Sequence, residues 1–107
     1  MNYALAIALL IALDYDETYT EDPLMWDRFI RLAAACGHTV ICVTGRHESE
    51  SAEVRESIGK LCAVYCTGRR AKLEYMTEIG RIPDVWIDDS PMFITQGAAV
   101  SRFVRKV

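Results

Sequence analysis

Two pairs of aspartates follow hydrophobic segments of the chain. Asp14 and Asp16 come directly after eleven consecutive apolar residues, and Asp88 and Asp89 follow a shorter apolar run. Side chains two residues apart leave an extended backbone on one face, so Asp14 and Asp16 can act on the same group. Carboxylates serve as nucleophiles, as proton carriers and as ligands of Mg²⁺. The structural alternatives are a solvated acidic turn for the first pair and a helix N-cap and turn for the second.

Residues of types that bind phosphate recur further along the chain. Thr44 offers a hydroxyl, and the backbone amides around Gly45 can face a phosphoryl oxygen. Lys72 can neutralise negative charge held between a carboxylate and a phosphoryl group, and Arg69 or Arg70 is the alternative for that contact. Read singly, Thr44 only ends a strand and Lys72 is a solvated helical lysine. The candidate substrate contacts are Gly45, Arg46, His47, Arg69 and Arg70.

The elements that must position these residues alternate between strand and helix. Continuous apolar runs are typical of parallel strands that are buried on both faces. Apolar residues at helical spacing, with Pro23 near the start and Gly37 at the end, indicate the first helix. A helical turn at 91–96 and a fifth strand at 100–104 follow. The predicted strands cover residues 5–13, 39–43, 62–66 and 85–87, and the predicted helices cover 23–36, 49–58 and 69–79.

This alternation predicts an α/β fold, an open parallel sheet with right-handed crossovers, and residues 1–107 are expected to form one domain. Functional groups gather at the carboxyl ends of the strands in such sheets. Each of the first four predicted strands leads into a polar group of a type used on phosphate or metal. In order, these groups are Asp14 with Asp16, Thr44, Lys72 beyond Gly68, and Asp88 with Asp89.

In this order the motifs resemble those of the haloacid dehalogenase (HAD) superfamily. Residues 14–18 (DYDET) after a hydrophobic strand fit its DxDxT motif, and residues 40–44 (VICVT) look like its strand that ends in Thr or Ser. Lys72 falls where the lysine of the third motif is expected, and residues 86–89 (WIDD) resemble the acidic fourth motif. The resemblance runs from about residue 9 to residue 91. DxDxT alone is moderately specific, whereas four motifs in order are highly specific.

The resemblance implies a three-layer, Rossmann-like sheet in the strand order 3-2-1-4, with a fifth strand beyond the fourth. It implies a Mg²⁺-dependent phosphomonoester hydrolase in which Asp14 forms an aspartyl-phosphate. Asp16 would protonate the leaving oxygen and later deprotonate the attacking water, while Thr44 and Lys72 complete the catalytic set. The implied metal ligands are Asp14, the backbone carbonyl of Asp16, and Asp88 directly, with Asp89 in contact through water or an outer position.

No cap domain fits between the motifs. Residues 17–43 are used by a turn and one helix, and residues 45–71 by a helix and a strand. The chain therefore resembles a small capless member of the phosphatase type. An open site suits a phosphate displayed on a macromolecule, such as a nucleic-acid end or a protein. The alternatives are a small-metabolite phosphatase capped by an oligomeric partner and a non-catalytic HAD-fold binding module.

The composition and charge narrow the classes of partner, compartment and metal site that the sequence allows. A net charge of −3 with 51% hydrophobic residues is typical of a globular domain and disfavours a broad nucleic-acid-binding or membrane-binding surface. The apolar N-terminal run lacks a basic flank and is shorter than the about twenty residues that span a bilayer. The four cysteines lie among apolar residues and are expected to be buried, reduced thiols. We therefore expect a cytoplasmic protein without a zinc site.

Overall fold

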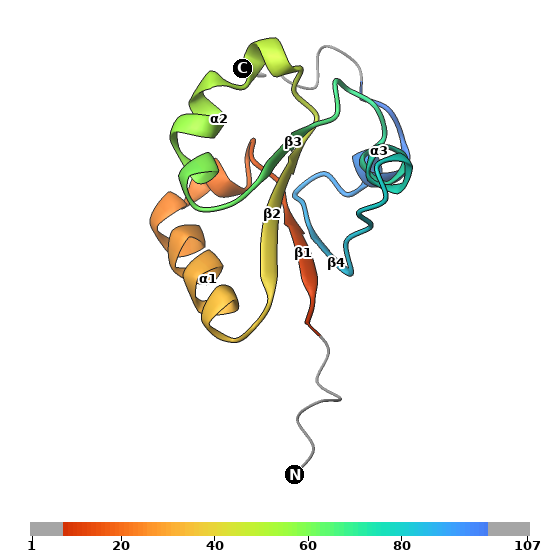
Figure 1. Cartoon of the computed structure of the whole chain (residues 1–107). Helices are drawn as coiled ribbons and strands as arrows, with labels where there is room; N and C mark the ends of the chain where they lie inside the picture. The colour runs from red at the N-terminus through yellow and green to blue at the C-terminus, as the bar shows by residue number, and fades with distance from the viewer. Residues whose placement is uncertain (1–7, 99–107) are drawn as a thin grey trace.

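A computed structural model of the chain describes residues 8–98 as alternating strands and helices (Figure 1). The strands are β1 (Leu10–Leu13), β2 (Thr39–Thr44), β3 (Val64–Cys66) and β4 (Val85–Ile87). The α-helices are α1 (Pro23–Ala35), α2 (Ala52–Glu56), α3 (Lys72–Glu78) and α4 (Met92–Thr95). Three short 3₁₀ helices are η2 (Tyr19–Glu21), η3 (Glu48–Glu50) and η4 (Ile58–Lys60). The predicted α/β class is confirmed.

The four strands form one parallel sheet in the order β3-β2-β1-β4. Leu13, the last residue of β1, pairs with Cys42 on one side and with Ile87 on the other. This register carries β1 and β4 to the same edge of the sheet, so the aspartates that follow both strands emerge together. The predicted order is confirmed for these strands, and the fifth strand predicted at 100–104 lies outside the described residues.

Two helical layers cover the two faces of the sheet (Figure 1). One face packs Leu13 and Cys42 against Ile30 of α1 and Val54 of α2. The other face packs Ala12, Ile41 and Val43 against Met76 of α3. Because strand side chains alternate between faces, each buried strand contributes to both clusters. The result is a Rossmann-like arrangement of three layers in which both faces of the central strands are packed.

Helix α1 begins at the predicted residue and ends at Ala35, one residue before the predicted end. Pro23 is its first residue, and the side chain of Asp22 accepts a hydrogen bond from the amide of Met25 at the N-terminus. Gly37 follows the C-cap with a φ of 87°, a left-handed conformation that glycine adopts without strain. The helix therefore returns the chain to β2 within a short turn.

The predicted helix at 49–58 is wrong in extent, because the segment is divided into η3, α2 and η4. Ser51 donates its hydroxyl proton to the carbonyl of Glu48, and Ser57 donates to that of Glu53, both at 2.7 Å. Serine side chains that bond nearby carbonyls compete with regular helical geometry. The two serines thus mark the places where the helix is interrupted.

Two other predicted elements are shorter in the structure. Helix α3 begins at Lys72 and not at Arg69, because Gly68 and Arg69 both have positive φ values, of 63° and 69°, which an α-helix excludes. β3 begins at Val64 and not at Cys62. β1 begins at Leu10, and the part of its predicted range at 5–7 lies outside the described residues.

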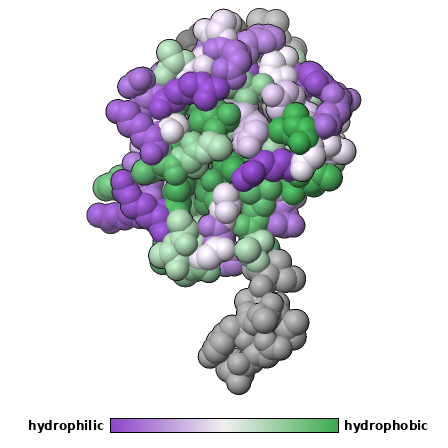
Figure 2. Space-filling view, viewed as in Figure 1, coloured by the Kyte–Doolittle hydropathy of each residue, from purple (hydrophilic) through white to green (hydrophobic). Residues whose placement is uncertain are grey.

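Hydrophobic side chains gather in the middle of the face in Figure 2, and hydrophilic side chains surround them. All four cysteines are free thiols, and Cys42 and Cys66 are buried as expected. Cys36, at the C-terminus of α1, is exposed, so the expected burial is wrong for this thiol. Among residues 8–98, no helix combines the length and the apolar character that a membrane span requires.

Candidate active site

Asp14, Lys72 and Asp88 form a buried ion-pair network at the carboxyl edge of the sheet. Asp14 follows β1, Asp88 follows β4, and Lys72 is the first residue of α3. The Nζ atom of Lys72 lies 2.7 Å from Oδ1 of Asp14 and 2.6 Å from Oδ2 of Asp88. The three side chains are at most 3% exposed. Three residues predicted from separate motifs therefore meet around one ammonium group.

Burial and the charge of the oppositely charged neighbours shift the pKa values of Asp14 and Lys72 in opposite directions. Burial raises the pKa of Asp14 to about 7, an effect that Lys72 opposes and the nearby Asp88 reinforces. Burial alone would lower the pKa of Lys72, but the carboxylates of Asp14 and Asp88 raise it. Lys72 is therefore a permanent cation at neutral pH, and Asp14 holds a proton more readily than an ordinary aspartate does.

Thr18 joins Asp14 to Asp89 on the other side of the centre. Its hydroxyl lies 3.2 Å from Oδ2 of Asp14 and 3.0 Å from Oδ1 of Asp89, and it accepts from the Asp89 amide at 3.2 Å. Thr18 is the threonine of the DxDxT-like motif, and its link to Asp89 could not be predicted from that motif alone. Thr18 thus fixes the loop after β1 to the loop after β4.

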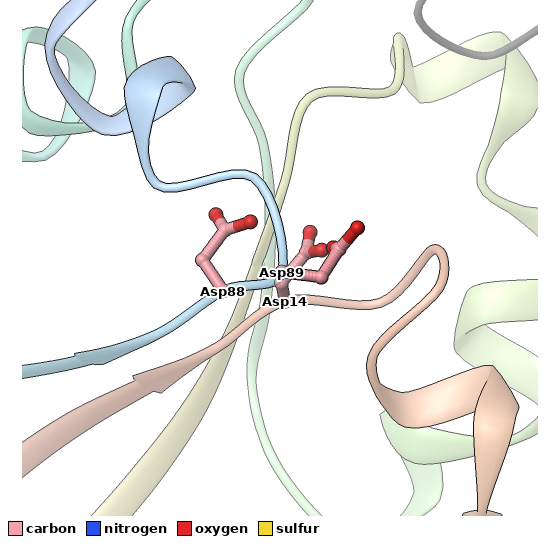
Figure 3. Close-up of side chains that lie close together, drawn as sticks. All are labelled: Asp14, Asp88 and Asp89. Carbon is pink, nitrogen blue, oxygen red and sulfur yellow. The ribbon is translucent and has the colours of Figure 1, made fainter.

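Asp14, Asp88 and Asp89 offer carboxylate oxygens that lie within 4.8 Å of one another. Figure 3 shows the carboxylates of Asp14 and Asp89 close together and that of Asp88 turned apart from them. Opposite ligands of Mg²⁺ are about 4.2 Å apart, so small side-chain rotations bring these oxygens to one ion. When all three carboxylates are ionised, they and Lys72 carry a formal net charge of −2, which one divalent cation would balance. The donor set could therefore hold a divalent cation such as Mg²⁺.

The two adjacent aspartates after β4 have different partners. Asp88 accepts from Lys72 through one oxygen and from the amide of Ser90 through the other, at 2.9 Å. Asp89 is exposed and receives the hydroxyls of Thr18 and Ser90. The side chain of Asp88 is thus occupied by the lysine and the turn, whereas Asp89 faces Asp14.

Arg46 holds Asp16 in a bidentate ion pair. Its Nε and one terminal nitrogen lie 2.9 and 2.7 Å from the two carboxylate oxygens of Asp16. The other terminal nitrogen donates to the carbonyl of Glu50 at 2.9 Å and to the carboxylate of Glu53. The guanidinium also lies over the ring of Tyr15, 5.1 Å from its centroid. Asp16, predicted as the general acid and base, therefore has both carboxylate oxygens held by Arg46 and is not one of the three clustered aspartates.

The other predicted substrate contacts also have partners within the chain. Arg69 forms two hydrogen bonds with Glu50, at 3.0 and 2.9 Å. Arg70 bonds Glu74 and Glu78 on the exposed surface of α3. The amide of exposed His47 donates to Glu50 at 2.8 Å. Arg69 and Arg70 are therefore paired with carboxylates of the same chain, and their contact with a substrate stays a prediction.

Thr44 and Gly45 lie buried at the end of β2. The Thr44 hydroxyl accepts from the amide of Arg46 at 3.3 Å. Three backbone hydrogen bonds join this loop to the loop after β3: Thr67 to Thr44, Arg69 to Gly45 and Gly68 to Arg46, at 2.8, 2.7 and 3.0 Å. A Cβ on Gly68 would lie 3.0 Å from Nδ1 of His47, so glycine permits this close approach. The two loops therefore form one connected wall of the site.

A cavity of about 420 Å³ opens beside the centre, between the loop after β1, the start of α1 and the end of β4. We call it the acidic pocket. Its apolar lining comes from Met25, Trp26 and Ile87, and Thr18 is also part of its wall. Five carboxylates line it: Glu17, Glu21, Asp22, Asp88 and Asp89. Sequence analysis did not predict this pocket, because its residues come from three separate segments.

In comparisons with protein-family models, curated proteins and solved structures, nothing matches the chain. The assignment to the HAD superfamily therefore stays a prediction from the sequence motifs.

Proposed function

We propose that the protein is a Mg²⁺-dependent phosphomonoester hydrolase of the HAD type, without a cap domain, that acts through an aspartyl-phosphate on Asp14. The supporting observation is the buried contact of Lys72 with both Asp14 and Asp88, beside a third carboxylate from Asp89. A surface cluster of acids would not bury its charges or surround an ammonium group. Burying such groups together is unfavourable unless they are paired, which favours a functional reason for the arrangement.

Asp14 and Asp16 have the chemistry of two successive steps. In the first, a carboxylate oxygen of Asp14 bonds to phosphorus, the bond from phosphorus to the leaving oxygen breaks, and Asp16 gives that oxygen a proton. In the second, Asp16 takes a proton from water, whose oxygen attacks phosphorus and breaks the bond to Asp14. Each proton transfer requires Asp16 to exchange a hydrogen bond from Arg46 for one to the reacting oxygen.

The residues around Asp14 supply the charge that these steps need. Lys72 stays positively charged and lies where it can neutralise a phosphoryl oxygen next to Asp14. Mg²⁺ held among the carboxylates of Asp14, Asp88 and Asp89 would reduce the negative charge of the phosphate. The hydroxyl of Thr44 and the backbone amides around Gly45 would bind the remaining oxygens.

Assay of an aryl phosphate with and without Mg²⁺ tests this proposal. We expect hydrolysis that requires Mg²⁺ and is lost in Asp14→Asn, and a stable complex with beryllium fluoride. Asp89→Asn should raise the Mg²⁺ concentration needed for half-maximal rate by about tenfold, because one charged ligand is lost. Hydrolysis that persists in Asp14→Asn would contradict the proposal. A protein that binds neither Mg²⁺ nor beryllium fluoride would favour the non-catalytic module.

The substrate remains a proposal of its own. The expected macromolecular phosphate fits an edge that carries no inserted domain between Asp14 and Lys72. A nucleic-acid end fits less well, because Arg46, Arg69 and Arg70 would have to exchange carboxylate partners for its phosphates. A panel that compares phosphorylated oligonucleotides, phosphopeptides and small phosphomonoesters separates these classes.

A further inference from the structure

The hydroxyl of Thr18 lies between the carboxylates of Asp14 and Asp89. Its oxygen is 3.2 Å from Oδ2 of Asp14 and 3.0 Å from Oδ1 of Asp89. A hydroxyl has one proton, so it can donate to only one of these oxygens at a time. The same oxygen accepts a hydrogen bond from the backbone amide of Asp89 at 3.2 Å. One side chain therefore contacts the carboxylate after β1 and both the carboxylate and the backbone of the loop after β4.

The hydroxyl of Thr18 is itself held in place. Thr18 is buried, its amide donates to the carbonyl of Tyr15 at 3.3 Å, and its carbonyl accepts from the amide of Glu21 at 3.2 Å. Threonine is branched at Cβ, which restricts rotation about χ1. A buried, branched side chain with a hydrogen-bonded backbone leaves the hydroxyl little freedom to move.

The two oxygens of Asp14 have different neighbours. Oδ1 lies 2.7 Å from Nζ of Lys72, whereas Oδ2 faces the Thr18 hydroxyl. The carboxylates of Asp14 and Asp89 lie close together (Figure 3). Two ionised carboxylates repel each other, and the exposed side chain of Asp89 can turn toward water. The contacts of Thr18 with both residues oppose that separation.

We propose that Thr18 is a positioning residue for the metal, whose hydroxyl holds the carboxylates of Asp14 and Asp89 where, with Asp88, they can reach one divalent cation. The inference rests on the proposed Mg²⁺-dependent function and adds to it a residue that does not itself bind the ion. Groups that are placed before binding raise affinity, because less free energy is spent on ordering them. A high Mg²⁺ concentration can supply the same free energy, so Thr18 should affect the metal requirement more than the rate at saturation.

Thr18→Val and Thr18→Ser separate the hydroxyl from the shape of the side chain. Valine keeps the branch and removes the hydroxyl, whereas serine keeps the hydroxyl and loses the methyl group. In NMR titrations of the full chain with Mg²⁺ alone, we expect the Kd to rise about tenfold in Thr18→Val and less than about threefold in Thr18→Ser. The same spectra show whether each variant is folded, and Thr18→Ala replaces Thr18→Val if valine is not accommodated. A role in stability alone would not produce this order of Mg²⁺ affinities.

Thr20→Val is the matched control in the same turn. The hydroxyl of exposed Thr20 accepts from the amide of Glu17 at 2.9 Å. Its removal loosens the turn and leaves the contacts of Thr18 in place, so the Kd for Mg²⁺ should stay within about twofold. Equal weakening in Thr18→Val and Thr20→Val would assign the effect to the turn and overturn the inference. An unchanged Kd in Thr18→Val would overturn it as well.

Hydrolysis of an aryl phosphate separates this inference from the proposed function. In Thr18→Val, the Mg²⁺ concentration for half-maximal rate should rise about tenfold, and the rate at saturating Mg²⁺ should stay within about twofold. Hydrolysis with an unchanged Mg²⁺ requirement would overturn the inference and leave the proposed function standing. Weaker Mg²⁺ binding in Thr18→Val, in a protein that hydrolyses no phosphomonoester, would support the role of Thr18 and overturn the proposed function. A protein that binds no Mg²⁺ would overturn both.

Discussion

The two flanks of the candidate centre are built from similar charged residues and differ in how those charges are paired. On the flank formed by the loops after β2 and β3, Arg46 is paired with Asp16 and Arg69 with Glu50. In the acidic pocket, Glu21 and Asp22 have no lysine or arginine partner among the described residues. Paired charges hold loops in place, whereas the side chain of Asp22 accepts the hydrogen bond that caps the start of α1. We infer that the first flank orients Asp16.

This comparison requires a reacting centre between the two flanks. Asp14→Asn keeps the shape of the side chain and removes the nucleophilic charge, so we expect hydrolysis to fall by at least about 10³-fold. Steady-state phosphate release measures the loss. Asp84→Asn makes the same change at the opposite edge of the sheet, where the carboxylate accepts from the amide of Leu10, and should keep activity. Similar activities of the Asp14→Asn and Asp84→Asn variants would contradict a reacting centre at Asp14.

Lys72→Met tests the charge balance of the centre. Removal of the ammonium leaves two buried carboxylates without their cation, and this should lower the free energy of unfolding by about 3–5 kcal/mol. Urea denaturation in EDTA measures the change, and Mg²⁺ should restore part of it. Arg70→Met removes an exposed partner of Glu74 and should change stability little. Equal stabilities of the two variants would show that the centre is not held by Lys72.

Arg46→Lys tests whether the paired flank orients Asp16. Lysine replaces a two-pronged contact with a single point charge, so we expect kcat to fall about tenfold with little change in KM. Guanidinium added to Arg46→Ala should recover part of the rate. Arg69→Lys, which alters a similar pair without touching Asp16, should keep kcat. A rise in KM at unchanged kcat would instead assign Arg46 to substrate binding.

The smallest expected effect concerns the acid stability of the same flank. The hydrogen bonds from Arg69, and then that from the His47 amide, lower the pKa of Glu50 from 4.5 to about 2. A lowered folded-state pKa stabilises the fold above pH 4.5, and this contribution is lost as the pH falls toward 2. The stability difference between the protein and Glu50→Gln should therefore shrink over that range. Urea midpoints at pH 7, 5 and 3 measure it, and a constant difference would contradict the assignment.

Much of the fold could be predicted because its signals are local. The apolar runs that became β2 and β4 and the Pro23 start of α1 follow from short-range chemistry. The late start of α3 could not be predicted from local signals. The left-handed conformation of Arg69 is stabilised by a contact with the loop after β2, which is distant in sequence. The interrupted helix at 49–58 depended on serine hydroxyls that a hydrophobic pattern does not reveal.

The candidate site also combines features that local sequence signals predict with features that depend on contacts between distant segments. The types and order of Asp14, Lys72 and Asp88 predicted that they would meet, since parallel strands end at one edge of the sheet. The partners of Arg46 could not be predicted, because several acids lie near it in the sequence and it contacts both Asp16 and Glu53 in the structure. The role of Thr18 required the loop after β4 to be in place.

Long sequence separations within the candidate site have a consequence for how activity arises during folding. Lys72 is 58 residues from Asp14, and Thr18 is 71 residues from Asp89. Contacts of this span form only after the chain has closed large loops, which is slow in parallel sheets. Helical circular dichroism should therefore recover before Mg²⁺ binding does in a refolding experiment. The proposed metal site would thus report the completed fold, because a partly folded chain would not bring its carboxylates together.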